Sequence, residues 1–152
     1  MTRAKLAEKY FIDGYACSQA VVLAFCDLTN IEKEDLLKLT LPLGGGLSRL
    51  RLTCGAINAL AIIIGLVFSS DCFTEENKLY IYEKTREVIN RFEKKWGTIN
   101  CKELLEKASL DVEIGGIPEK RSAEYYQKRP CGKIVYSAAL VLEEYLKEQN
   151  KL

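Results

Sequence analysis

The chain has 152 residues, of which 48% are hydrophobic and 28% charged, as expected for one soluble globular domain over residues 1–152. Its net charge of +1 excludes the strongly basic surface of a nucleic-acid-binding protein, so no nucleic-acid partner is expected. The chain has no histidine, which excludes a Cys–His nucleophile and directs attention to its six cysteines.

The N-terminus is charged and lacks the apolar core of a signal peptide. The longest apolar run, residues 56–68, is shorter than the roughly 20 residues that a membrane span needs. We therefore expect a cytoplasmic protein with no membrane span. In that compartment, widely spaced cysteines are more often reduced core residues or metal ligands than structural disulfides.

The N-terminal part of the chain predicts three short helices, because apolar residues recur at helical spacing between turn signals. These helices are expected over residues 2–11, 15–28 and 32–41. Pro42 ends the third of them. Cys17 lies near the start of the second helix, on its apolar face. Cys26 faces the opposite way, about half a revolution round the helix at roughly 100° per residue, and is expected to pack in the core.

A glycine-rich, basic loop leads into the most apolar segment of the chain. The loop residues expected to contact a cofactor are Gly44, Gly45, Gly46, Arg49 and Arg51. Thr53 is a good N-cap, which predicts a buried helix from there to residue 68. Cys54 would then lie in the first turn, where the helix dipole and the upstream arginines are expected to lower the pKa of its thiol.

The C-terminal half contains two clear helix starts. Thr74 is an expected N-cap, and Asn100 with Glu103 resembles a capping box. The expected elements are helices over 75–96 and 133–147, a helix starting at residue 101, a loop over 111–119 and a solvated basic segment or short helix over 120–128. Cys101 and Cys131 therefore lie at or near helix starts.

The predicted fold class is all-α, a compact single-domain bundle of about six to seven helices, because no segment shows the alternation typical of strands. Four cysteines share a position near a helix start, where negative charge is favoured. They are Cys17, Cys54, Cys101 and Cys131. Cys26 and Cys72 lie outside this set. Converging thiolates could hold a metal or an iron–sulfur cluster or undergo oxidation, and the spacing alone does not choose among these functions.

The chain resembles a family of redox-active bacterial proteins named for its C…GCAxxG…C…C cysteine pattern. The segments that carry the resemblance are Cys17-Ser18-Gln19-Ala20-Val21, Gly44-Gly45-Gly46, Cys54-Gly55-Ala56, Asn100-Cys101-Lys102-Glu103-Leu104 and Cys131. Around Cys54 the chain departs from the literal pattern, because Thr53, Gly55 and Asn58 stand where the pattern has Gly, Ala and Gly.

The resemblance implies a redox role for the four cysteines. It also implies a relation to the N-terminal part of split-Soret-type cytochromes, in which an iron–sulfur centre accompanies haems; this chain has no CxxCH haem-attachment site. The leading hypothesis is an electron-transfer protein in which Cys17, Cys54, Cys101 and Cys131 bind a two-iron cluster.

Three alternatives remain open at this point. The first is a metal-free thiol–disulfide redox protein with Cys54 as the attacking thiolate. The second is a structural zinc site of the four thiolates, and the third is a helical interaction protein with buried cysteines. An unidentified redox protein is the expected partner, and the sequence leaves open a homodimer and whether the protein is an enzyme.

Overall fold

A computed structural model describes all residues, 1–152, and contains helices and no β-strand, so the all-α prediction is confirmed. Eight helices have at least six residues. They are α1 (Arg3–Ile12), α2 (Cys17–Ala24), α3 (Lys33–Thr40), α5 (Gly55–Phe68), α6 (Glu75–Trp96), α7 (Cys101–Lys107), α8 (Ala123–Lys128) and α9 (Cys131–Glu148). The short elements are η1 (Cys26–Leu28), η2 (Leu41–Leu43) and the glycine turn α4 (Gly44–Leu47).

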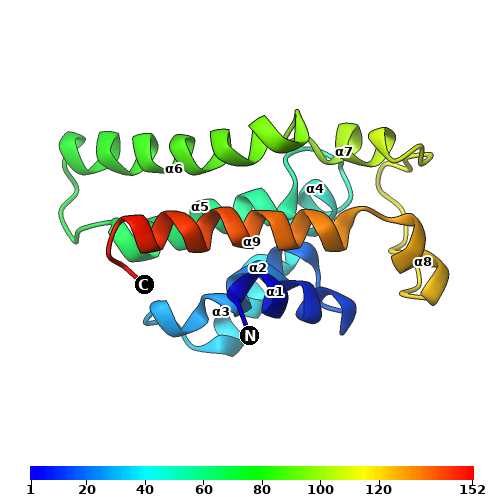
Figure 1. Cartoon of the computed structure of the whole chain (residues 1–152), viewed down its shortest axis with the longest axis horizontal. Helices are drawn as coiled ribbons and strands as arrows, with labels where there is room; N and C mark the ends of the chain where they lie inside the picture. The colour runs from blue at the N-terminus through cyan, green and yellow to red at the C-terminus, as the bar shows by residue number, and fades with distance from the viewer.

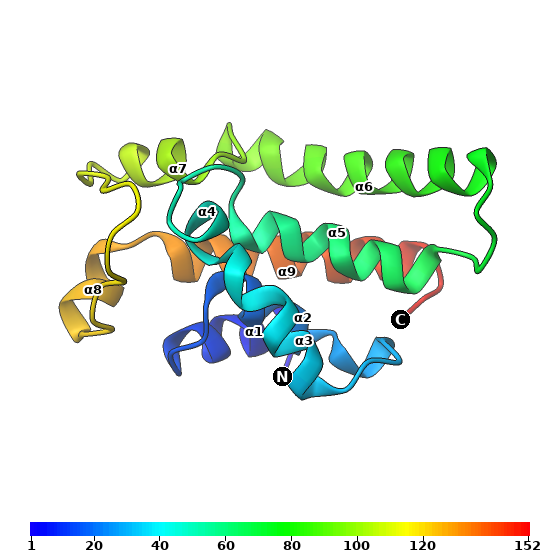
Figure 2. The ribbon, with the colours of Figure 1, turned by 180° about the vertical axis from the view of Figure 1, so that it is seen from behind.

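The helices form three tiers, which Figures 1 and 2 show from opposite sides. The long helix α6 forms one outer tier, α5 and α9 run side by side in the middle, and α1, α2 and α3 cover the opposite side. The short elements α4, α7 and α8 gather at one end of the molecule. The chain enters α5, α7 and α9 at this same end, so several helix N-termini lie close to one another there.

The core is built around α5, which packs against α2, α6 and α9. A helix packed on several sides is apolar over most of its surface, which explains why Asn58 is the only strongly polar residue of this segment. Ile57, Leu60 and Ile63 of α5 are fully or almost fully buried, and burying one such side chain stabilises the fold by about 1.5–3 kcal/mol. None of the helices combines the length and the apolar character needed to cross a bilayer.

Two predicted helix starts are confirmed by their cap hydrogen bonds. The N–H of Asn77 donates to Oγ1 of Thr74 at 3.1 Å, and the N–H of Glu103 donates to Oδ1 of Asn100 at 3.0 Å. The expected helix over residues 15–28 is too long, because α2 ends at Ala24 and a short 3₁₀ turn follows. Cys26 lies in that turn and is only partly buried against the core.

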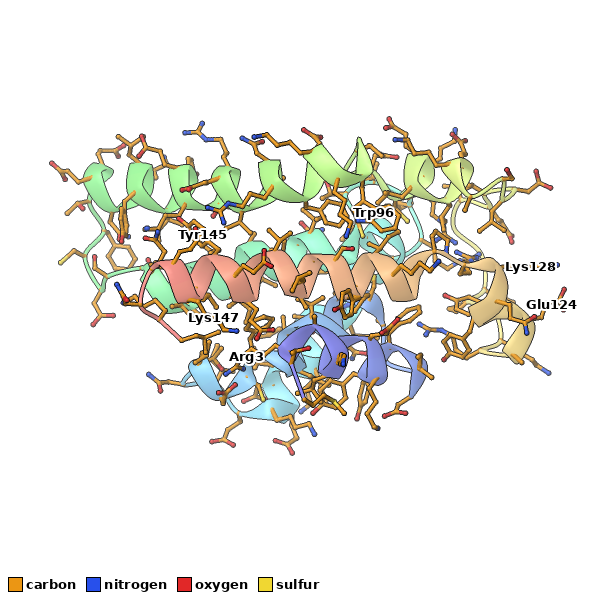
Figure 3. The ribbon with its side chains drawn as sticks, viewed as in Figure 1. Arg3, Trp96, Glu124, Lys128, Tyr145 and Lys147 are labelled. Atoms are coloured by element: carbon orange, nitrogen blue, oxygen red, sulfur yellow. The ribbon has the colours of Figure 1, made fainter.

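The basic segment 120–128 contains the short helix α8, whose two sides differ. Figure 3 shows Glu124 and Lys128 projecting outward, and both side chains are exposed. Tyr125, on the other side of α8, packs against Phe11. The prediction of a solvated segment is therefore right for one side of α8 and wrong for the other.

Candidate functional site

A cavity of about 780 Å³ lies at the end of the molecule where α4, α7 and α8 gather. Four of the residues that line it are Cys17, Cys54, Cys101 and Cys131. The structure thus brings together the four cysteines singled out in the sequence, and all are free thiols. Cys26 and Cys72 do not line the cavity. That these four thiols act chemically stays a prediction at this point.

Cys17, the first residue of α2, is the thiol whose surroundings most favour the thiolate. A hydrogen bond with the Cys54 thiol is the largest influence, and the backbone N–H groups of Gly45 and Ser18 and the charge of Arg121 act in the same direction. Burial opposes them, and the net effect lowers the pKa of Cys17 to about 6. The glycine loop therefore does supply an N–H group to a sulfur, but that sulfur belongs to Cys17.

Cys54 does not have the position or the pKa expected from the sequence. Thr53 forms an antiparallel bridge with Asn100, and the N–H of Cys54 donates to the carbonyl of Ile99 at 2.8 Å. The chain therefore stays extended, and Cys54 itself becomes the N-cap of α5. The hydrogen bond with Cys17 and burial raise the pKa of Cys54 well above its ordinary value. Within this pair the interaction favours the thiolate at Cys17 and the protonated thiol at Cys54.

Cys101 and Cys131 begin α7 and α9, respectively. Burial raises the pKa of Cys101, although Nη1 of Arg51 donates to its sulfur at 3.7 Å and opposes the rise. Arg51 thus serves Cys101, and the expectation that it acts on Cys54 is wrong. Burial and the negative charge of Cys17 raise the pKa of Cys131 to about 12. Both thiols are protonated at neutral pH, beside a single thiolate.

The glycine loop is wound in the left-handed conformation, which side chains rarely adopt. Positive φ angles occur at Gly45, Gly46, Leu47, Ser48, Arg49 and Arg51. Strained backbone of this kind persists only where surrounding contacts hold it, and it concentrates at functional sites. Of the predicted cofactor contacts, Gly44, Gly45, Arg49 and Arg51 line the cavity, whereas Gly46 lies buried behind it.

Two glycines allow the segments of the site to approach one another closely. A Cβ atom at Gly46 would lie 2.6 Å from Cβ of Cys101. A Cβ atom at Gly55 would lie 2.7 Å from Sγ of Cys17 and 2.7 Å from the carbonyl oxygen of Leu43. Real Cβ atoms do not approach other atoms this closely, so any other residue at either position would push a cysteine away from the cavity.

The cavity wall carries more positive charge than the sequence indicated. Its charged lining residues are Arg49, Arg51, Arg121, Arg129 and Glu119. Sequence reasoning missed both Arg121, which it placed in the solvated segment 120–128, and Arg129, which it treated only as part of the lead-in to the last helix. The ring of Tyr125 supports both, with its centroid 4.9 Å from the guanidinium of Arg121 and 5.0 Å from that of Arg129. The sequence did contain a signal for this packing, because Tyr125 and Tyr126 lie between the two arginines.

The kinds of donor at the site suit a metal cluster, but their spacing does not suit a single metal ion. Four cysteine thiols are the ligand set that an iron–sulfur cluster takes. However, no three of the cysteine, aspartate or glutamate side chains lie close enough together to hold a metal ion. This result concerns a single ion, so cluster binding by the four thiols stays a prediction. The sulfur of Cys17 packs against Gly55, the neighbour of Cys54.

A family model described as "Putative redox-active protein (C_GCAxxG_C_C)" matches residues 15–145 of the chain. The chain belongs to this family. The matched region contains all four cavity cysteines, and membership supports a redox role for the protein. No curated protein and no solved structure matches the chain. The iron–sulfur cluster and the relation to split-Soret cytochromes stay predictions.

Proposed function

We propose that the protein is a thiol–disulfide redox protein in which Cys17 is the attacking thiolate and Cys54 the resolving thiol. The observation that carries this proposal is the position of both thiols in the wall of one cavity, where the sulfur of Cys17 packs against Gly55, the neighbour of Cys54. A pKa of about 6 makes Cys17 mostly thiolate at neutral pH. Its value is also close enough to neutrality that the sulfur keeps much of its nucleophilicity.

The reaction partner in this proposal is a disulfide. The Cys17 thiolate attacks one substrate sulfur and forms a mixed disulfide, and the other substrate sulfur leaves as a thiolate that takes a proton from water. Cys17 no longer carries a charge, so the largest influence that raises the pKa of Cys54 is removed and burial becomes the main one that still raises it.

Cys54 then gives its proton to water, and its sulfur attacks Cys17. The remaining substrate sulfur is displaced and is protonated in turn. The substrate disulfide has gained two electrons and become two thiols, while the protein has lost two electrons and gained a Cys17–Cys54 disulfide. The reverse sequence of steps would oxidise a dithiol.

A second candidate is an electron-transfer protein with a two-iron cluster on Cys17, Cys54, Cys101 and Cys131. The convergence of four thiols from four helix starts on one cavity favours it. Such a cluster would supply one-electron transfer. No three of these donors are grouped closely enough for a single metal ion, so this candidate concerns a cluster and not a mononuclear site.

The two candidates are separated by purifying the protein anaerobically and measuring iron, zinc, acid-labile sulfide and free thiols. The thiol–disulfide proposal expects a colourless, metal-free protein that loses two thiols under a mild oxidant, with a Cys17–Cys54 crosslinked peptide in the mass spectrum. Brown protein with iron and sulfide that is lost in Cys17→Ala would support the cluster. Metal-free protein with an unchanged thiol content would overturn both.

A further inference from the structure

The charges in the cavity identify the kind of disulfide that fits there. We propose that the substrate is a small organic disulfide bearing carboxylate groups, with the guanidinium of Arg49 binding a carboxylate while Cys17 attacks the sulfur. This inference rests on the proposed function, because it names the substrate class of the same site. Three observations support it: a free donor, an excess of positive charge and the size of the cavity.

Arg49 supplies the free donor. Its side chain is only 11% exposed, and its Nε donates to the carbonyl of Gly115 at 2.7 Å, which fixes the guanidinium in place. Its Nη2 is buried and makes no hydrogen bond. This Nη2 forms an ion pair with the carboxylate of Glu113 at 3.5 Å, but the Glu113 side chain is 71% exposed, so the pair is weak and a substrate carboxylate could displace it. A substrate carboxylate would satisfy this donor, because guanidinium and carboxylate groups match in geometry and charge.

Two of the other arginines, Arg51 and Arg121, are held by backbone carbonyls and not by carboxylates. Nε of Arg51 donates to the carbonyl of Glu113, and Arg121 donates to the carbonyls of Phe11 and Tyr15. These uncharged acceptors position the guanidiniums and leave their charges in place. Arg129 pairs with Glu119, the one carboxylate among the lining residues. Four arginines against Glu119 and Glu113, which pairs with Arg49, leave an excess of two positive charges, more than the Cys17 thiolate alone can balance.

The volume of the cavity favours a small molecule over a protein partner. Its 780 Å³ falls within the roughly 300–1,000 Å³ typical of small-molecule pockets. Cys17, the attacking thiol, is only partly exposed and lies in the cavity wall, so the substrate disulfide has to enter the cavity to reach it. A flexible, carboxylated disulfide can place one sulfur at Cys17 and one carboxylate at Arg49.

The charge preference can be measured with two alkylating reagents of similar size, anionic iodoacetate and neutral iodoacetamide. Residue-resolved mass spectrometry of the reduced, metal-free protein gives the ratio of the two rates at each cysteine. At Cys17 we expect a ratio at least about tenfold above that at exposed Cys72, because an electropositive cleft concentrates anions. Equal ratios at Cys17 and Cys72 would overturn the inference.

Matched variants test the assignment to Arg49. Arg49→Gln should lower the ratio at Cys17 towards that of Cys72, and Arg49→Lys should restore part of it. Arg86→Gln removes the same charge from an exposed position on α6 and should leave the ratio unchanged. Should Arg49→Gln not fold, Arg129→Gln tests whether the positive charge of the cavity sets the preference at Cys17. A ratio that falls equally in Arg86→Gln would mean that net charge, not the cavity, sets the preference.

Failure of this inference can be distinguished from failure of the proposed function. Rapid reaction of Cys17 with both reagents and no preference for the anion would leave the thiol–disulfide function standing and remove the substrate class. If Cys17 reacts with neither reagent, the proposed function fails. The role of Arg49 can also be tested without any reaction at Cys17, by comparing how tightly wild type and Arg49→Gln bind S-methylglutathione, an unreactive anionic thioether. The wild type should bind more tightly, and equal binding would overturn the inference.

Discussion

Replacing Gly55 with alanine changes stability in two opposite ways, because it raises helix propensity and crowds the packing at the centre of the site. Alanine is favoured over glycine within a helix by up to about 1 kcal/mol. The added Cβ, however, would lie 2.7 Å from Sγ of Cys17, 2.7 Å from the carbonyl oxygen of Leu43 and 3.3 Å from Cα of Gly44. Two of these are backbone atoms that cannot move aside cheaply. Overpacking of this kind typically costs about 1–3 kcal/mol, so Gly55→Ala should be destabilising overall.

Gly65→Ala is the matched control, because it lies in the same helix with no atom within 4 Å of the new Cβ. It should raise the free energy of unfolding by about 0.4–1 kcal/mol. Urea titration of both variants under reducing conditions measures their free energies of unfolding. The difference between the two variants gives the cost of the steric contact at Gly55, because both gain the same helix propensity. The displaced Cys17 sulfur in Gly55→Ala should also lose its partner Cys54, and its pKa should rise towards about 8.5. Equal stabilisation by both substitutions with an unchanged pKa would refute this reasoning.

Three further predictions follow from the same structure. Cys54→Ala removes the main hydrogen bond that lowers the pKa of Cys17 to about 6, so the thiolate fraction and the alkylation rate at pH 7 should fall and the pH profile should shift upward. Asn100→Ala removes the cap of α7 and should lower the free energy of unfolding by about 0.5–2 kcal/mol in denaturant titration. Asn100→Ser still offers a capping oxygen and should retain most of that stability. Replacing Cys26 and Cys72 with alanine should leave the two-thiol loss under mild oxidant unchanged and cost about 1 kcal/mol through packing at Cys26. Disappearance of the oxidisable pair in that variant would show that the wrong cysteines line the reactive site.

Helix starts could be predicted where a side chain caps the helix locally. Thr74 and Asn100 accept hydrogen bonds within their own first turns, so neighbouring residues contain the information. Thr53 has the same local pattern, but its backbone pairs with Asn100 from a segment far along the chain. This long-range pairing delays the start of α5 and makes Cys54 its N-cap. No property of the residues around Thr53 predicts that contact.

The set of cavity cysteines could be predicted, but the partner of each thiol could not. All four lie at or beside a helix start, which the local sequence indicates. Arg51 is close to Cys54 in sequence, yet the left-handed loop directs its guanidinium to Cys101. The N–H of Gly45 likewise reaches Cys17 from a distant segment. The local sequence therefore predicts a lowered pKa at Cys54, whereas the three-dimensional contacts lower the pKa of Cys17.

The pairing of Cys17 with Cys54 joins the start of α2 to the start of α5, segments separated by much of the N-terminal half of the chain. A disulfide between them would close a long loop in the unfolded chain and stabilise the oxidised fold by about 4 kcal/mol in the chain-entropy model. By thermodynamic linkage, that stabilisation makes the disulfide of the folded protein harder to reduce than the same disulfide in the unfolded chain. At 30 mV for each 1.4 kcal/mol, the difference in reduction potential is roughly 90 mV. The topology of the helices would thus help to set the reduction potential of the Cys17–Cys54 pair.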